Sequence, residues 1–252
     1  MRRVLIIDAG HALADGLQAA VAARILHLTN SAFFGLPSQV RTIEQALTYA
    51  GVQTVKSLVF AAEAFRCFAT GAGVAPLPLE EIQDHALLSA SIARRMLSDR
   101  EAAEEAFTAA LLHDVGQLVL ATRLPEEFRA DRATAAQQRR PLHEIEEGRY
   151  GVSHAEIGAY LLALWGLPET IVEAIANHHT PMRVEHEAFE LLDAVHLASH
   201  LAHEQGGAAN PDGTGDGEID PDYVQTLHLD ECMPQWRAMA AEQARAGSDQ
   251  AG

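Results

Sequence analysis

The chain has 252 residues, 48% of them hydrophobic, which is enough for one or two ordinary hydrophobic cores. Aromatic residues make up only 6% and long alternating β-branched runs are absent, so we expect an all-α protein. The formal net charge of −17 disfavours nucleic acids and anionic membrane surfaces as partners, because both carry negative charge.

The cysteine content and the apolar runs indicate the compartment. Cys67 and Cys232 are too few and too far apart for a disulfide framework, which favours reduced thiols in the cytoplasm. The first apolar run ends at Asp8, too early for a signal peptide, and no run reaches the roughly 18 residues of a membrane span. We therefore expect a cytoplasmic protein.

The first twenty residues form a segment of their own. The apolar residues 4–7 (VLII), then Asp8 and a helical pattern resemble the first strand and helix of a response-regulator receiver domain. Ala9 stands where such domains usually have a second acidic residue, and no segment of receiver length follows. We interpret residues 1–20 as a receiver-like remnant or extension.

Residues 21–70 are expected to form an amino-terminal helical subdomain. Apolar residues recur at helical spacing with breaks at Gly35 and Gly51, which predicts three helices. Thr42 begins a Thr-x-x-Gln capping signature and predicts a helix start near Ile43. A Gly- and Pro-containing break over residues 71–78 then separates this block from the next one.

Residues 80–204 are expected to form a second helical subdomain. Its helices are predicted over residues 80–97, from 101 to about 113, from 154 to 165, from 168 to 179, and over 187–204. Ser153 and Glu156 form a Ser-x-x-Glu capping signature, which places His154 in the first turn of its helix. Residues 205–221 are rich in Gly, Asp and Pro and predict a flexible loop, and residues 222–252 predict a final helix and tail.

Side chains that can bind a divalent metal gather at ends or first turns of the predicted helices. They are His85, His113, Asp114, His154, His178 and His179. Helix ends are places where a bundle can direct several side chains into one pocket. Imidazole and carboxylate ligands suit Mn, Fe, Zn or Ni, and two such ions would activate a water molecule and bind a phosphate.

Three separated phrases resemble the HDOD domain family. LLHDVGQLVL around His113 is similar to the HD signature of phosphohydrolases, and residues 24–59 and 154–181 resemble the corresponding HDOD segments. The resemblance covers residues 21–204. It implies an all-α, HD/HDOD-type helical fold of two packed helical subdomains. It also implies a regulatory domain of bacterial two-component signalling, often behind a receiver domain and generally without proven catalysis.

The resemblance also assigns roles to individual residues. All six metal-competent residues match ligand types of the catalytic relatives. Ser199, however, stands where HD enzymes place an aspartate, and Gln117 replaces a lysine of the related HD-GYP phosphodiesterases. No Gly-Tyr-Pro phrase follows His179. A serine hydroxyl supplies neither the charge nor the basicity of a carboxylate, so we expect weak or mononuclear metal binding.

Several alternatives stay open at this point. Asp193, His196 and His200 lie three and four residues apart, so they can share a helix face and are candidates to replace the lost ligand. The site would otherwise be a buried polar network without metal, a site for one ion without turnover, or a catalytic centre. The remaining histidines, including His143 and His203, are interpreted as surface or packing residues.

The favoured function is a non-catalytic HDOD module that regulates other signalling proteins, such as a kinase or a cyclic-dinucleotide enzyme, by docking. The competing function is a metal-dependent phosphohydrolase acting on a phosphodiester or nucleotide. The expected cofactor is none, or one divalent ion of Fe, Mn, Ni or Zn. The family normally has one or two further helices before the block that begins near residue 21, and residues 1–20 are candidates to replace them. If they do not, an exposed apolar face would favour a homodimer or association with a partner.

Overall fold

The structure is a computed structural model that describes residues 22–23, 25–31, 34, 39–69, 79–185, 188–206 and 219–248. These residues form helices and turns without a strand, which confirms the predicted all-α fold. The predicted receiver-like segment (1–20) and most of the predicted loop over 205–221 lie outside the described residues. Within the described ranges, no helix is both long and apolar enough to cross a bilayer.

The helices follow one another with short connections. Helical residues 25–29 precede α2 (Ile43–Ala50) and α3 (Val52–Ala69). The remaining elements are α4 (Leu79–Met96), α5 (Arg100–Leu112), α6 (Val115–Arg123), α7 (Pro125–Gln138), α8 (Leu142–Tyr150), α9 (His154–Leu164), α10 (Glu169–Asn177), η2 (Pro181–Arg183), α11 (Leu191–Gly206), α12 (Pro221–Thr226) and α13 (Met233–Ser248). The sequence patterns had not predicted separate helices at α6, α7, α8 and α12.

Capping residues set two of the helix starts that position the site. A capping box of Ser153 and Glu156 makes His154 the first residue of α9, as predicted. The start of α11 lies a few residues later than predicted. The reason is local, because Asp193 accepts a hydrogen bond of 2.8 Å from the backbone N–H of Glu190, directly before the helix.

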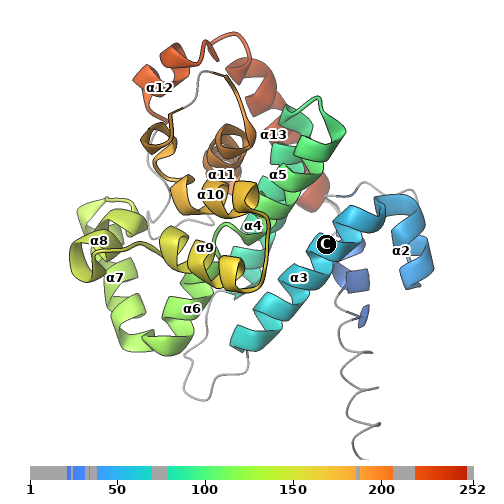
Figure 1. The fold of residues 1–252 in the computed structure, drawn as a ribbon, viewed down its shortest axis with the longest axis horizontal. Coiled ribbons are helices and arrows are strands. Elements are labelled where there is room, and N and C mark those ends of the chain that lie inside the picture. The colour runs from blue at the N-terminus through green and yellow to red at the C-terminus, as the bar shows by residue number, and fades with distance from the viewer. Residues whose placement is uncertain are drawn as a thin grey trace, which may run out of the picture.

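The core is built around α4, α5 and α11, which pack against one another at the centre of the molecule (Figure 1). Each helix presents buried alanines at helical spacing, and such small side chains let helix axes approach closely. These are Ala86, Ala90 and Ala93 on α4, Ala106 and Ala110 on α5, and Ala194, Ala198 and Ala202 on α11. Helices α10 and α13 pack against this centre, and Trp236 of α13 contacts it.

A second, smaller hydrophobic cluster lies among α6, α7 and α8. It contains Leu120, Phe128, Ala135, Leu142 and Ile145. A third cluster, at the amino-terminal end of the described chain, joins α2 and α3 through Val40, Ala46 and Val55. The second cluster fixes α8 beside α9, and this places polar side chains of α8 next to the start of α9.

Two glycines let α6 and α9 touch through their backbones. A Cβ atom on Gly116 would overlap the carbonyl oxygen of His154 and lie 2.7 Å from its carbonyl carbon. A Cβ atom on Gly158 would lie 3.0 Å from the backbone nitrogen of Gly116. Asp114 precedes α6 and His154 begins α9, so this close contact brings both side chains to one place.

We predict that Gly116→Ala destabilises the protein by about 3 kcal/mol, because the added methyl group can only be accommodated by separating two helices. Gly148→Ala is the matched control. Its Cβ would meet nothing within 4 Å on α8, so a gain of about 0.5–1 kcal/mol is expected. Urea unfolding of both variants measures the difference, and equal stabilities would contradict the close contact of α6 and α9.

Candidate metal centre

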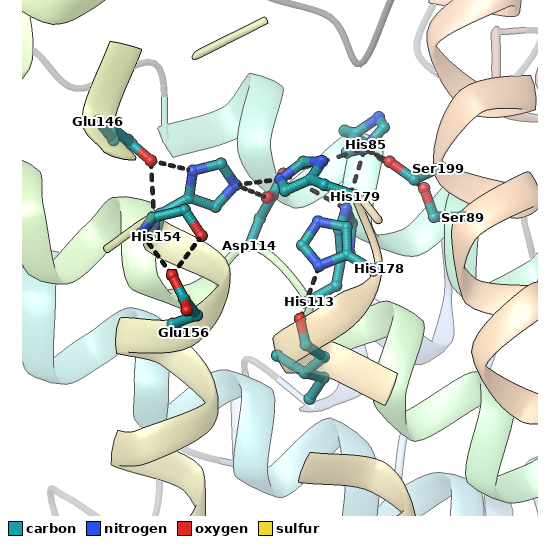
Figure 2. Close-up of polar contacts among 12 residues, drawn as sticks. His85, Ser89, His113, Asp114, Glu146, His154, Glu156, His178, His179 and Ser199 are labelled. Atoms are coloured by element: carbon teal, nitrogen blue, oxygen red, sulfur yellow. Dashed lines mark hydrogen bonds and ion pairs between the residues drawn. The ribbon is translucent and has the colours of Figure 1, made fainter. Parts of the chain in front are cut away.

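The six predicted site residues converge in the interior, as Figure 2 shows. Five of them stand where helices begin or end: His113 (C-cap of α5), Asp114 (N-cap of α6), His154 (start of α9), His178 (C-cap of α10) and His179 directly after it. His85 differs from the prediction, because it lies in the second turn of α4 rather than at a helix end.

His85, His113 and Asp114 form the first group. The Nε2 atoms of His85 and His113 are 3.3 Å apart. One carboxylate oxygen of Asp114 lies 3.4 Å from Nε2 of His113 and 4.0 Å from Nε2 of His85. One ligand atom from each residue lies within 4.8 Å of the others, so the three side chains can share one ion.

His154, His178 and His179 form the second group. The Nε2 atoms of His154 and His179 are 2.9 Å apart, and all three side chains again offer ligand atoms within 4.8 Å of one another. The second carboxylate oxygen of Asp114 lies 3.1 Å from Nε2 of His154. Asp114 therefore connects the two groups.

Hydrogen bonds on the far side of three imidazole rings fix their orientation. Nδ1 of His113 lies 2.6 Å from the carbonyl oxygen of Ala110, and Nδ1 of His178 lies 2.8 Å from that of Ile175. Nδ1 of His154 lies 2.6 Å from a carboxylate oxygen of Glu146. Each acceptor requires an N–H at Nδ1, which makes Nε2 the nitrogen available to the pocket.

The charges around Asp114 and His154 favour the ionised forms of both side chains. Burial acts to raise the pKa of Asp114, but His113, the hydrogen bond to His154 and the charges of His154 and His85 hold that pKa well below its usual range. Burial acts to lower the pKa of His154. The charge of Glu146, together with hydrogen bonds to Asp114 and Glu146, instead raises it well above 6.5.

The geometry fits a divalent ion. Atoms that bind one ion at about 2.0–2.2 Å lie about 2.8–3.6 Å apart at octahedral to tetrahedral angles. Two pairs of Nε2 atoms in the centre are 2.9 and 3.3 Å apart, and two pairs of Nε2 and carboxylate oxygen atoms are 3.1 and 3.4 Å apart. Only the 4.0 Å between Nε2 of His85 and Asp114 would have to shorten around a bound ion. Two Nε2 atoms at such distances need a proton or a cation between them, because both otherwise present lone pairs. Five imidazoles and one carboxylate suit Fe, Mn, Ni or Zn.

Ser199 lies at the edge of the first group. Its hydroxyl oxygen is 3.4 Å from Nε2 of His85, and the hydroxyl of Ser89 is 3.5 Å from the same nitrogen. Asp193, His196 and His200, the suggested replacements, join neither of the two groups that the described residues form. Asp193 instead accepts a hydrogen bond of 2.8 Å from Tyr223.

Three residues near the centre had not been predicted. Glu146 is fully buried and binds both the backbone N–H and Nδ1 of His154. His143 is buried and stacks on His179, with 4.0 Å between the ring centroids. The ring centroids of His203 and His85 are also 4.0 Å apart. His143 and His203 had been interpreted as surface or packing residues, and these ring contacts are packing against candidate ligands. The i, i+3 spacing of His143 and Glu146 was a usable signal, but only once a helix is assigned there.

We predict that Glu146→Gln lowers the pKa of His154 in the metal-free protein, because it removes a charge that favours the imidazolium. A raised histidine pKa stabilises the fold fully below pH 6.5, and this contribution disappears as the pH rises through the raised pKa. The variant should therefore lose most stability below pH 6.5. NMR titration of the imidazole measures the pKa, with Glu144→Gln on the same helix as control. An unchanged His154 titration would contradict the role given to Glu146.

Known proteins resemble this chain in sequence and in fold. A Treponema pallidum protein described as uncharacterized is 25% identical over 175 residues, which are 69% of this chain and 34% of that protein. The chain thus spans about a third of the length of this curated relative.

Three solved structures share the fold. An HDOD domain protein of unknown function from Geobacter sulfurreducens has 23% identity and a TM-score of 0.59, over 92% of this chain and 86% of that one. A Shewanella amazonensis protein, provisionally named a phosphohydrolase, has 22% identity and a TM-score of 0.60, over 94% and 86%. A Marinobacter aquaeolei protein, provisionally named a signal transduction protein, has 22% identity and a TM-score of 0.64, over 90% and 50%.

The family profile of the HDOD domain matches residues 17–181, a stretch that contains all six residues of the two groups. Because this match extends over well more than half of the sequence, the chain belongs to the HDOD domain family.

Proposed function

We propose that this chain is a regulatory signalling module that holds one divalent metal ion between its helix ends and acts by docking to another signalling protein, without hydrolysing a substrate. The proposal rests mainly on the position of Ser199. Its neutral hydroxyl lies beside His85, where the catalytic relatives are expected to supply a carboxylate, in an otherwise metal-competent centre.

The chemistry of the ligand set supports one ion without turnover. Only Asp114 contributes an anionic oxygen to the two groups, and Ser199 contributes none. A bound ion would supply positive charge next to Asp114 and could lower the pKa of a bound water. The chain's own residues orient the centre: Glu146 holds His154, while the backbone carbonyls of α5 and α10 hold His113 and His178.

The outer face of α9 supports docking as the mode of action. Tyr160 and Leu164 are 69% and 67% exposed and lie one helical turn apart. Large apolar side chains exposed side by side are typical of surfaces that bind proteins. The same helix begins with His154, so the metal centre and this face share one rigid element. A kinase or a cyclic-dinucleotide enzyme is the proposed class of partner, in keeping with the signalling name of the Marinobacter relative.

A second candidate function, metal-dependent phosphodiester or nucleotide hydrolysis, is favoured by the position of Asp114. Its two oxygens lie near His113 and His154, so Asp114 and the histidines of both groups would hold two ions, which would supply an activated water and positive charge for a phosphate. The provisional name of the Shewanella relative agrees with this chemistry. Metal content and turnover decide between the two functions.

We predict that protein purified without chelator contains a single Fe, Mn, Ni or Zn ion per chain and does not hydrolyse cyclic dinucleotides or a generic phosphodiester. Asp114→Ala should abolish metal binding, because it removes the anionic ligand that connects the groups. Elemental analysis and hydrolysis assays measure both properties. Two ions per chain with turnover abolished by Asp114→Ala would establish the hydrolase instead, whereas a metal-free wild type would refute the metal centre.

We further predict that Ser199→Asp increases metal content toward two ions per chain, because it places a carboxylate beside His85. Ser199→Asn is the matched control, since asparagine has the shape of aspartate without its charge. Metal titration followed by elemental analysis compares the variants. Equal metal content in both variants would show that the missing carboxylate at position 199 does not limit the number of ions that the centre binds.

A further inference from the structure

The carbonyl group of His178 accepts a hydrogen bond from a side chain of another helix. It lies at the C-terminal end of α10, where backbone acceptors have no partner within the helix. His196, in the second turn of α11, reaches it with Nδ1 at 2.7 Å from the carbonyl oxygen. The imidazole N–H donates this hydrogen bond, and His196 is only 5% exposed, so water competes little for it.

This carbonyl belongs to the peptide group that joins His178 to His179. Both side chains are in the second group: Nδ1 of His178 is held by the carbonyl of Ile175, and Nε2 of His179 faces Nε2 of His154 at 2.9 Å. A rotation of the shared peptide group would displace both imidazoles at once. One hydrogen bond from α11 thus reaches the peptide group between two candidate ligands that directly follow α10.

We propose that His196 is a positioning residue of the metal centre, which holds the His178–His179 peptide group so that both imidazoles face the pocket. It acts through that backbone and is not itself in either ligand group. The role rests on the proposed metal centre, since His178 and His179 are two of its ligands. It differs from the replacement of a lost ligand that the sequence had suggested for His196.

The surroundings of His196 keep its ring in place. The ring of Tyr223 packs edge-on against it, with 4.9 Å between centroids, and the ring of His200 lies at 4.5 Å. Tyr223 is buried and donates its hydroxyl hydrogen to Asp193 over 2.8 Å. Because Tyr223 belongs to α12, this short helix supports the ring that holds the end of α10.

The test compares two amide variants of His196. The amide nitrogen of Asn can take the place of Nδ1, whereas the longer Gln places its nitrogen near the position of Nε2. With Co²⁺ as the probe, His196→Gln should lower the metal affinity of the full chain about 10–100-fold and alter the d–d absorption spectrum. His196→Asn should bind Co²⁺ nearly as wild type does. Ser57→Ala, which removes a hydrogen bond of 2.6 Å to Thr108 between α3 and α5, controls for general destabilisation.

Wild-type affinity for Co²⁺ in the Gln variant, or equal losses of affinity in the Asn and Gln variants, would overturn the proposal.

NMR of the metal-free protein distinguishes a failure of this proposal from a failure of the metal centre. The amide nitrogen shift of His179 should change in His196→Gln but not in His196→Asn. In wild type, Nδ1 of His196 should carry a proton, and an unprotonated Nδ1 would overturn the proposal even if no variant folds. A wild type that binds no Co²⁺ would refute the metal centre alone, and the His179 shift would then decide the role of His196.

Discussion

Burying the carboxylate of Asp114 imposes the strictest physical constraint on this fold. A buried anion is costly unless charges or hydrogen-bond donors surround it. Here His113 and His154 approach its two oxygens from different helices, and His85 lies beyond His113. The partners can reach Asp114 only because Gly116 lets α6 touch α9 and because buried alanines let α4, α5 and α11 pack closely. The small residues of the core and the polar centre therefore depend on each other.

The same constraint explains why support for the centre extends beyond its ligands. Imidazoles that face one another must present nitrogen atoms in defined protonation states, which requires acceptors behind them. Glu146 from α8 and backbone carbonyls from α5 and α10 supply those acceptors. In this arrangement Ser199 changes the chemistry rather than the architecture, because a hydroxyl can still hydrogen bond to His85 while contributing no charge.

Much of the fold and part of the site could be predicted from the local sequence. The Ser153–Glu156 capping box placed His154 correctly at the start of a helix, since a cap depends on four adjacent residues. By contrast, α8 was missed because its sequence LHEIEEGRY is largely polar and shows little apolar periodicity. Without that helix, the contacts of Glu146 with His154 and of His143 with His179 could not be anticipated.

By itself, the sequence determined the all-helical class, the resemblance to the HDOD family and the identity of the six metal-competent side chains. These features depend only on residue types and on their spacing over short stretches of the chain. Only the tertiary structure decided that these side chains form two groups joined by Asp114. It also decided that His196 holds a backbone carbonyl instead of replacing Ser199. Both outcomes depend on which helix faces approach one another, and packing between residues that are distant in the chain decides this.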